Sequence, residues 1–259
     1  MLIQVCTLMP MRTTMNYQYR HGTTTGAAFR TLYADGGIVR FYRGIAPALL
    51  QGPLSRFGDT AANAGVLAAL EHPSTKELPV FFKSMLASGA AAAWRICLMP
   101  IDTTKTIMQV EGKNGFSILK AKIGKSGPKV LFHGALAASG ATYVGHFPWF
   151  FTYNYLQAHL PHYDENSKVW KLARNAFIGF SASVCSDTIS NSVRVTKTTK
   201  QTFASPISYP EAVKYVIEKD GVMGLFGRGL KTRLLANGLQ GLLFSVLWRS
   251  FEERINKMF

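Results

Sequence analysis

The chain of 259 residues has few acidic residues, few cysteines and no long apolar run free of charge. Fourteen Asp and Glu oppose 29 Lys and Arg, which gives a formal charge of +15, and charged residues make up only 17%. Soluble domains contain roughly 25% charged residues. Cys6, Cys97 and Cys185 are widely separated and lack paired or His/Cys ligand spacing, which excludes a disulfide framework and a zinc site. The hydrophobic content of 47% argues against disorder. A basic soluble protein and a polytopic membrane protein remain.

A short motif recurs three times and points to internal repetition. The segments read MPMRTT, MPIDTTK and NSVRVTK, and they align on Pro10, Pro100 and Ser192 with spacings of 90 and 92 residues. These three positions are predicted to bend their helices, because proline lacks a backbone N–H and crowds the preceding turn.

A second signature, aromatic and then basic with a closing glycine, follows each of these motifs. It reads FYRG, FHG and FGRG and ends at Gly44, Gly134 and Gly229, with spacings of 90 and 95 residues. Because the proline motifs and the glycine signatures recur at nearly the same spacing, we predict three repeats, at residues 1–71, 78–160 and 168–259. Only nine residues precede Pro10, so the first helix is expected to be truncated.

Apolar stretches rich in small residues flank the motifs in each repeat. Residues 45–70, 135–160 and 230–251 follow the glycines, and residues 80–99 precede the second proline motif. Such stretches are long enough for a hydrocarbon core of about 30 Å at 1.5 Å per helical residue. The alternative, a soluble helical solenoid, usually has shorter repeats of about 30 to 47 residues. We therefore predict an all-α membrane protein with six transmembrane helices in three pairs, each pair joined by a short amphipathic helix.

The repeated motifs resemble those of the mitochondrial carrier family. Pro100, Asp102 and Lys105 match the family pattern Pro-x-Asp/Glu-x-x-Lys/Arg in full, and the aromatic-basic-glycine signature follows at the family's position. The resemblance extends over the whole chain. It implies a pseudo-threefold barrel of six helices with short matrix-side helices, a multi-pass location in the mitochondrial inner membrane, and alternating access of a solute to a central site. It implies a transporter and not an enzyme, with no cofactor.

Charged residues within the predicted spans are candidates for solute binding, because a charge in a bilayer needs a protein or water partner. Arg95 and Asp187 occupy equivalent places in repeats two and three, five residues before Pro100 and Ser192. Two alternatives remain open for these two residues, a solute site or a buried ion pair between two helices. Arg56 is a candidate for an anionic group of the solute, although Asp59, three residues away, is placed to neutralise it. Phasing from the glycines completes the candidate set: Arg56, Asp59, Arg95, Asp187, His146, Gln51 and Gln240.

The resemblance also implies a matrix gate, in which the acid of each proline motif pairs with the base of the next repeat. The gate positions are Arg12, Asp102, Arg194, Lys105 and Lys197, with Met15 in place of the first base. Only the pair of Asp102 with Lys197 keeps opposite charges. Arg12 is expected to face Lys105 with the same sign, and Arg194 to face Met15. The gate is therefore expected to be weak unless an anion, a lipid headgroup or a partner protein supplies negative charge.

The basic surplus has two explanations, a lipid-binding surface or a solvated face that sets insertion orientation. The resemblance implies bound cardiolipin at the glycine signatures, and the candidate residues there are Arg43, Gly44, Gly134, Arg228 and Gly229. Nucleic-acid binding is not favoured, since the cations follow the repeat instead of clustering on one element.

Two functions are compatible with these patterns. The first is a carrier for a small anionic or zwitterionic metabolite. The second is a carrier-derived structural subunit of a larger respiratory assembly that no longer transports, which the altered gate favours. The chain has no phosphate loop, nucleophile elbow or HExxH motif, and so no enzymatic mechanism is indicated.

Overall fold

The computed structural model describes residues 2–70, 80–161 and 168–256, and within these ranges the chain is helical without any strand. The expected repeat boundaries at residues 1, 71, 78 and 259 lie outside the described residues. The helices are α1 (Leu2–His21), α2 (Thr25–Phe41), α3 (Ile45–Ala69), α4 (Val80–Cys97), α5 (Met99–Glu111), η1 (Gly112–Asn114), α6 (Gly115–Ser126), η2 (Pro128–Phe132), α7 (Ala135–His159), α8 (Lys168–Thr202), α9 (Tyr209–Gly227) and α10 (Leu230–Asn256).

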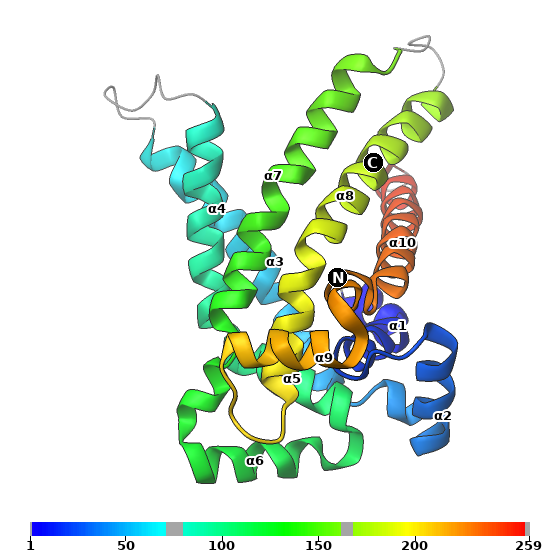
Figure 1. Cartoon of the computed structure of the whole chain (residues 1–259). Coiled ribbons are helices and arrows are strands. Elements are labelled where there is room, and N and C mark those ends of the chain that lie inside the picture. The colour runs from blue at the N-terminus through cyan, green and yellow to red at the C-terminus, as the bar shows by residue number, and fades with distance from the viewer. Residues whose placement is uncertain (1, 71–79, 162–167, 257–259) are drawn as a thin grey trace.

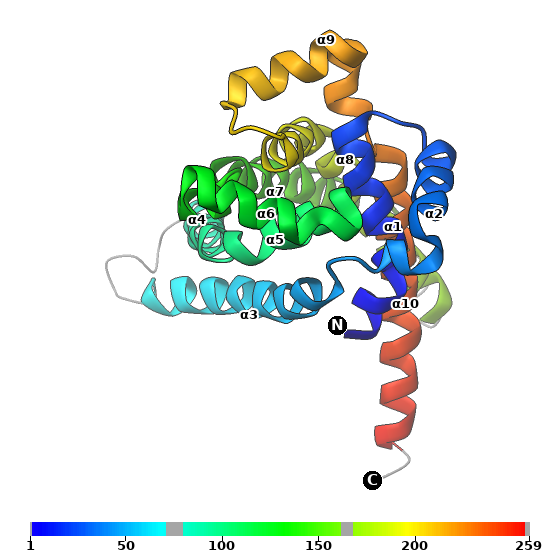
Figure 2. The ribbon, with the colours of Figure 1, turned by 90° about the horizontal axis from the view of Figure 1, so that it is seen from below.

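The long helices form a closed ring that follows chain order. α1 packs against α3, α3 against α4, α4 against α7, α7 against α8 and α8 against α10, and α10 returns to α1. α5 continues from α4 and packs against α1, α3 and α8. Helices α2, α6 and α9 lie toward one end of this ring, and the ring helices extend away from them (Figures 1 and 2).

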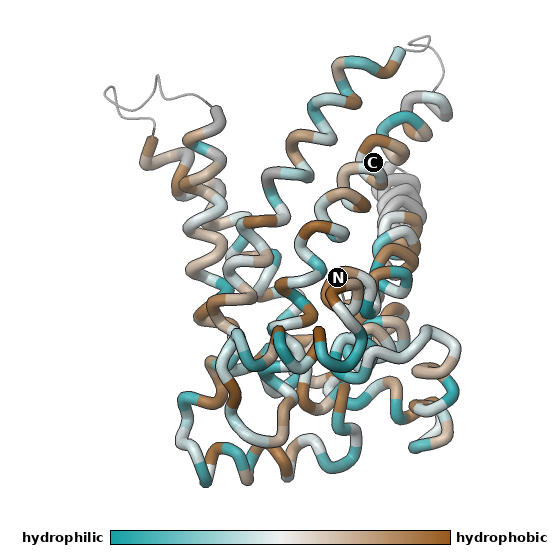
Figure 3. The backbone as a smooth tube through the Cα atoms, viewed as in Figure 1, coloured by the Kyte–Doolittle hydropathy of each residue, from teal (hydrophilic) through white to brown (hydrophobic). Residues whose placement is uncertain are grey.

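Hydrophobic and hydrophilic residues alternate along the long helices (Figure 3). Among the described residues, no helix combines the length and the apolar composition needed to cross a membrane.

The proline positions affect their helices differently. Of the three motifs, only the second interrupts its helix: α4 ends at Cys97 and α5 begins at Met99. α1 is continuous through Pro10, and α8 is continuous through Ser192. Helix α1 thus stays unbroken although Pro10 lacks a backbone N–H, and α8 stays unbroken at Ser192, which retains one. One contact recurs in all three motifs, a threonine hydroxyl that donates to the carbonyl four residues before it: Thr14 to Pro10 (2.9 Å), Thr104 to Pro100 (2.8 Å) and Thr196 to Ser192 (2.9 Å).

The glycine signatures place each following helix closely against a neighbour. Gly44, Gly134 and Gly229 have φ of +82°, +87° and +66°, a left-handed conformation that favours glycine, and they directly precede α3, α7 and α10. The side of each glycine on which a Cβ would stand packs against a residue of the next expected repeat, in cyclic order. A Cβ would lie 3.0 Å from the Lys105 carbonyl oxygen at Gly44, 3.0 Å from Lys197 Cγ at Gly134, and 3.2 Å from the Met15 carbonyl oxygen at Gly229.

Three basic side chains bind the C-terminal ends of helices in the same cyclic order. Arg40 donates to the carbonyls of Gln109 (2.9 Å) and Val110 (2.7 Å) at the end of α5. Lys122 donates to the Gln201 carbonyl at the end of α8 (3.2 Å), and burial lowers the pKa of Lys122.

Arg228 completes the cycle by donating to the carbonyls of Tyr19 (3.3 Å) and Arg20 (3.4 Å) at the end of α1. Unsatisfied carbonyls at a helix C-terminus favour a cation. These contacts therefore connect the ends of three helices that are distant in sequence.

The start of α9 is fixed by a reciprocal cap. The Ser208 hydroxyl accepts from the Glu211 N–H (3.3 Å), and the Glu211 carboxylate accepts from the Ser208 N–H (2.6 Å). The backbone hydrogen bond from Ser208 lowers the pKa of Glu211. The capping box thus accounts for the start of this amphipathic helix.

Candidate functional site

The ring encloses a polar cavity of about 490 Å³. This volume lies within the range of small-molecule sites. Side chains from α1, α3, α4, α5, α7, α8 and α10 line it. Seven cationic residues are among them, namely Arg12, Arg56, Arg95, Lys105, Arg194, Lys197 and Arg233, whereas Asp59 and Asp102 are the acidic lining residues. The cavity is therefore strongly positive.

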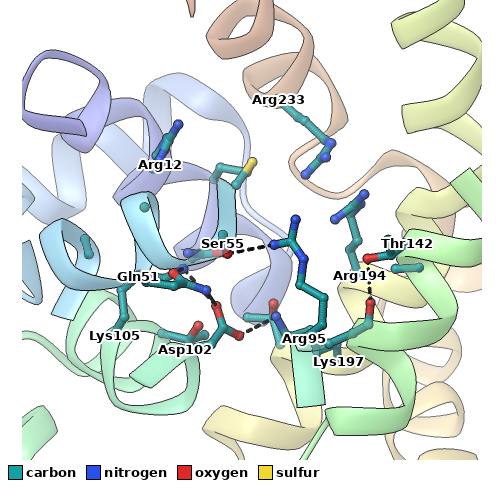
Figure 4. A pocket seen from close by; sticks show the side chains of 18 of the residues that line it. Arg12, Gln51, Ser55, Arg95, Asp102, Lys105, Thr142, Arg194, Lys197 and Arg233 are labelled. Carbon is teal, nitrogen blue, oxygen red and sulfur yellow. Dashed lines mark hydrogen bonds and ion pairs between the residues drawn. The ribbon is translucent and has the colours of Figure 1, made fainter. Parts of the chain in front are cut away.

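Asp102 is the centre of a buried network at one end of this cavity (Figure 4). Its carboxylate accepts from the ammonium groups of Lys105 (2.8 Å) and Lys197 (2.5 Å), and from the Gln51 amide (2.7 Å). The expected contact of Asp102 with Lys197 is thus present. The network extends through Gln201, which donates to Asp102 (3.5 Å) and to Thr103 (3.0 Å). One carboxylate holds two cations, so a positive charge remains.

Arg95 and Asp59 form an ion pair between α4 and α3. The Arg95 Nη2 to Asp59 Oδ2 distance is 2.7 Å, and Arg95 also donates to the Ser55 hydroxyl (3.1 Å). One of the alternatives drawn from the sequence is corrected by this contact. Asp59 neutralises Arg95 and not Arg56, because α4 packs against α3 and brings the Arg95 guanidinium to Asp59.

Asp187 is paired within the α8–α10 contact. It is 5% exposed and accepts from Arg233 (2.7 Å) and from the Asn237 amide. The alternative of an ion pair between Arg95 and Asp187 is therefore wrong, since each has a different partner. Asp187 is not a lining residue, whereas Arg233 and Asn237 are. The two carboxylates predicted to bind the solute, Asp59 and Asp187, are thus both paired with arginines of the protein.

Three arginines of the cavity have no carboxylate within ion-pair distance among the described residues. Arg12 donates to the Gln240 amide oxygen (2.8 Å), and Arg194 donates to the Ser190 hydroxyl (3.3 Å). Arg56 is exposed toward the cavity. Arg12 occupies an acid position of the expected gate and remains within electrostatic reach of Lys105. The seven cations of the cavity are opposed by Asp59 and Asp102 in its wall and by Asp187, which pairs with Arg233. The cavity and these partners together therefore carry an excess of four positive charges.

The other predicted candidates take different positions. His146 lines the cavity and forms a hydrogen bond with Ser88 (2.6 Å), which links α7 to α4. Gln51 and Gln240 belong to the contacts of Asp102 and Arg12. The structure thus brings all the predicted solute candidates except Asp187 to the cavity wall.

The residues predicted to bind lipid do not form one kind of site. Arg228 is buried, and its side chain pairs with Asp220 (2.7 Å). It is therefore not available to a lipid headgroup, because its guanidinium is enclosed between Asp220 and the end of α1. Arg43 is half-buried beside Gly44. An apolar groove of about 480 Å³ lies next to Gly134, lined by residues that include Leu136, Val193 and Phe226.

Sequence analysis missed several residues of the site. Arg233, Asn237 and Tyr19 line the cavity, and Gln201 extends the Asp102 network. Arg233 lies four residues after Gly229, before the inner positions that were phased from that glycine. Examining every charged residue within the predicted spans would have identified Arg233, which lies in the span at residues 230–251. Nothing in the local sequence marks Tyr19 or Gln201.

Comparison with known protein families identifies one domain in the chain. The sequence model of the family described as mitochondrial carrier protein matches residues 77–164. Residues 77–164 therefore form a mitochondrial carrier domain, which supports the predicted membership of the mitochondrial carrier family. Members of this family are transporters rather than enzymes. No curated protein matches the chain in a direct sequence comparison.

Proposed function

We propose that this protein is a multi-pass solute carrier of the mitochondrial inner membrane that moves a small anionic metabolite by alternating access. The observation that carries the proposal is the positive cavity at the centre of the helix ring. An excess of four positive charges favours an anionic solute over a zwitterion of zero net charge, since the charges of a zwitterion cancel.

The distribution of apolar residues supports a lipid environment. Large apolar side chains are exposed on the long helices, including Phe57 at 68%, Leu136 at 71%, Phe177 at 57% and Leu242 at 66%, while the cavity inside is charged. A soluble protein usually buries such residues and exposes its charges. In a bilayer, charged groups face the protein interior or a water-filled cavity, as they do here.

The Asp102 network is suited to act as the matrix gate. It joins α5 to α8 through the ion pair with Lys197 and connects α3 through Gln51. Opening the cavity at this end requires these contacts to separate, and the solute must compensate the loss. Three repeats arranged around an axis agree with the cyclic contacts of Gly44, Gly134 and Gly229 and with those of Arg40, Lys122 and Arg228.

We further propose that an anionic lipid such as cardiolipin binds beside Gly134. The neighbouring groove is apolar, as acyl chains require, and Lys200 and Lys129 lie in segments close in sequence to its walls. Arg43 beside Gly44 is the corresponding cation in the first segment. Because Arg228 is enclosed in an ion pair, the third signature is expected to bind such a lipid least well.

Uptake into liposomes tests the proposed transport. Full-length protein is reconstituted in vesicles that contain cardiolipin, and the uptake of labelled phosphate, ATP, citrate and glutamate is measured in both loaded and empty vesicles. We expect saturable uptake of at least one multiply charged anion, which Asp102→Asn reduces because the gate loses its central carboxylate.

Arg30→Gln is the matched control, because it removes one cation from an exposed position on α2 outside the cavity. It is expected to leave uptake unchanged. If no tested anion shows saturable uptake while the reconstituted protein remains folded, the proposal of transport is wrong.

A further inference from the structure

We propose that Arg12, Arg194 and Arg233 form a phosphate-binding subsite, which receives a phosphoryl group of a solute with two or more phosphate charges. This inference rests on the proposed carrier function and specifies its substrate class. The three arginines come from α1, α8 and α10, and each of these helices packs against the other two.

The arginines are close enough to repel one another. Arg233 is the charged neighbour that acts most strongly on both Arg12 and Arg194. Asp187 is the one carboxylate near the cluster in the described part of the chain; it pairs directly with Arg233 at 2.7 Å and also lies within electrostatic reach of Arg194. The cluster therefore retains two uncompensated positive charges. Such repulsion is unfavourable in a partly dehydrated cavity unless an anion occupies it.

The arginines also retain unused hydrogen-bond donors. Arg12 uses one terminal nitrogen on Gln240, Arg194 uses Nε on Ser190, and Arg233 uses Nε on Asp187. Apart from the approach of Arg233 to the Tyr19 hydroxyl, their remaining guanidinium nitrogens make no hydrogen bond of good geometry with the described residues. Figure 4 shows the three side chains reaching the same pocket from different elements.

Tyr19 supplies an independent observation. It lines the cavity, and its side chain is 2% exposed, yet its hydroxyl has no hydrogen-bond partner at bonding distance in the described part of the chain. The Arg233 guanidinium approaches this hydroxyl without the alignment of a good hydrogen bond, and Arg194 lies within electrostatic reach of it. A buried hydroxyl without a partner costs free energy, so its persistence beside two arginines indicates a ligand acceptor.

The arrangement of donors favours phosphate over carboxylate. A carboxylate accepts through two oxygens in one plane. The three guanidinium groups come from three different helices and line one cavity with Tyr19, an arrangement that suits the oxygens of a tetrahedral phosphoryl group. A second phosphoryl group of the solute would neutralise part of the remaining positive charge of the cavity, at Arg56 or at the lysines of the Asp102 network.

Occupancy of this subsite would also affect the gate. Arg12 and Arg194 stand at positions where the family pattern has acidic residues. A bound phosphoryl group supplies the negative charge that these positions lack and links α1 to α8. The solute would thus contribute to the contacts that hold these helices together.

The test measures stabilisation of the full-length protein in detergent by inorganic pyrophosphate. Thermal unfolding is followed by the fluorescence of its four tryptophans, with sodium chloride at equal ionic strength and with malonate as comparison ligands. We expect pyrophosphate to raise the Tm more than either. Arg194→Gln and Arg12→Gln are each expected to weaken the apparent affinity about 10-fold or more, the value of one lost charge-assisted contact.

A structural role would produce a different result in the ligand-free protein. Because repulsion is relieved, Arg194→Gln is expected to keep or raise the Tm without pyrophosphate while it lowers the response to pyrophosphate. Tyr19→Phe is expected to weaken the response without removing charge, and Arg30→Gln on α2 is expected to retain the full response. Equal stabilisation of wild type, Arg12→Gln and Arg194→Gln would overturn the proposal, as would equal stabilisation by malonate.

The result is separable from that of the transport assay. A pyrophosphate response that depends on Arg194 supports the subsite even if vesicles show no uptake, in which case only the carrier function fails. Saturable uptake that is unchanged in Arg12→Gln and Arg194→Gln retains the carrier function and overturns the subsite.

Discussion

Replacement of Asp102 by asparagine tests the central network of the structure. Asp102 holds the ammonium groups of Lys105 at 2.8 Å and Lys197 at 2.5 Å, and the exposed fractions are 8% for the Asp102 side chain and 19% for each lysine. Asparagine has the same shape without the charge, so Asp102→Asn leaves two largely buried cations beside each other. Removing one partner of a buried ion pair costs about 3–5 kcal/mol of the free energy of unfolding.

The expected change in thermal stability follows from this free energy. For a chain of this size, about 2–4 °C of Tm corresponds to 1 kcal/mol, so Asp102→Asn is expected to lower the Tm by roughly 6–20 °C. The double variant Asp102→Asn with Lys197→Gln removes one of the two unpaired cations. It is expected to recover part of the loss, with an interaction free energy of about 0.5–3 kcal/mol.

Tryptophan fluorescence during thermal unfolding in detergent measures both variants, with Arg30→Gln as the control for loss of an exposed charge. The reasoning is refuted if Asp102→Asn unfolds at the wild-type temperature, or if Lys197→Gln adds its full cost to that of Asp102→Asn. Either result would mean that Asp102 does not compensate the lysines.

Three further predictions concern residues outside the cavity. Arg228→Gln is expected to lower the free energy of unfolding by about 3 kcal/mol, because it removes the ion pair with Asp220 together with the hydrogen bond to the Tyr19 carbonyl. A Tm equal to that of wild type would contradict this. Gly229→Ala is expected to destabilise more than Gly221→Ala. Both have positive φ, but a Cβ at Gly229 would lie 2.7 Å from the Tyr19 ring while Gly221 faces open space; equal Tm values would disprove the contact. Glu211→Gln is expected to lower the Tm at pH 7. The pKa of Glu211 is lowered by its backbone hydrogen bond, so its contribution is present above the unfolded pKa of about 4.3 and is lost as the pH falls through the lower folded value. A Tm difference between wild type and Glu211→Gln that persists below that range would contradict the assignment.

Much of the helical layout was accessible from the sequence, for local reasons. The expected stretch at residues 80–99 is represented by α4 and the start of α5, and α3, α7 and α10 begin directly after the glycines that were singled out. A positive φ excludes most side chains, so glycine marks such a turn in the sequence. The Asp102–Lys197 contact also agrees with the motif, because its spacing places both residues on inner helix faces.

The sequence left the partners of the other charges open, because helical spacing gives the face of a helix and not the neighbour opposite that face. Arg95 pairs with Asp59, and Asp187 pairs with Arg233, contacts that depend on which helices lie side by side. Arg228 reads as an exposed lipid contact in the sequence, whereas the structure buries it against the end of α1.

The amino-acid sequence alone determined the repetition of the motifs, the helical class and the positive charge of the chain, because these follow from residue identity and spacing. Only the tertiary structure decided which cations remain without a counter-ion. Closing the ring brings Arg12, Arg194 and Arg233 together across 221 positions of sequence, and the excess charge of a cavity is a property of all its walls at once. The proposed preference for a multiply charged anion rests on this property.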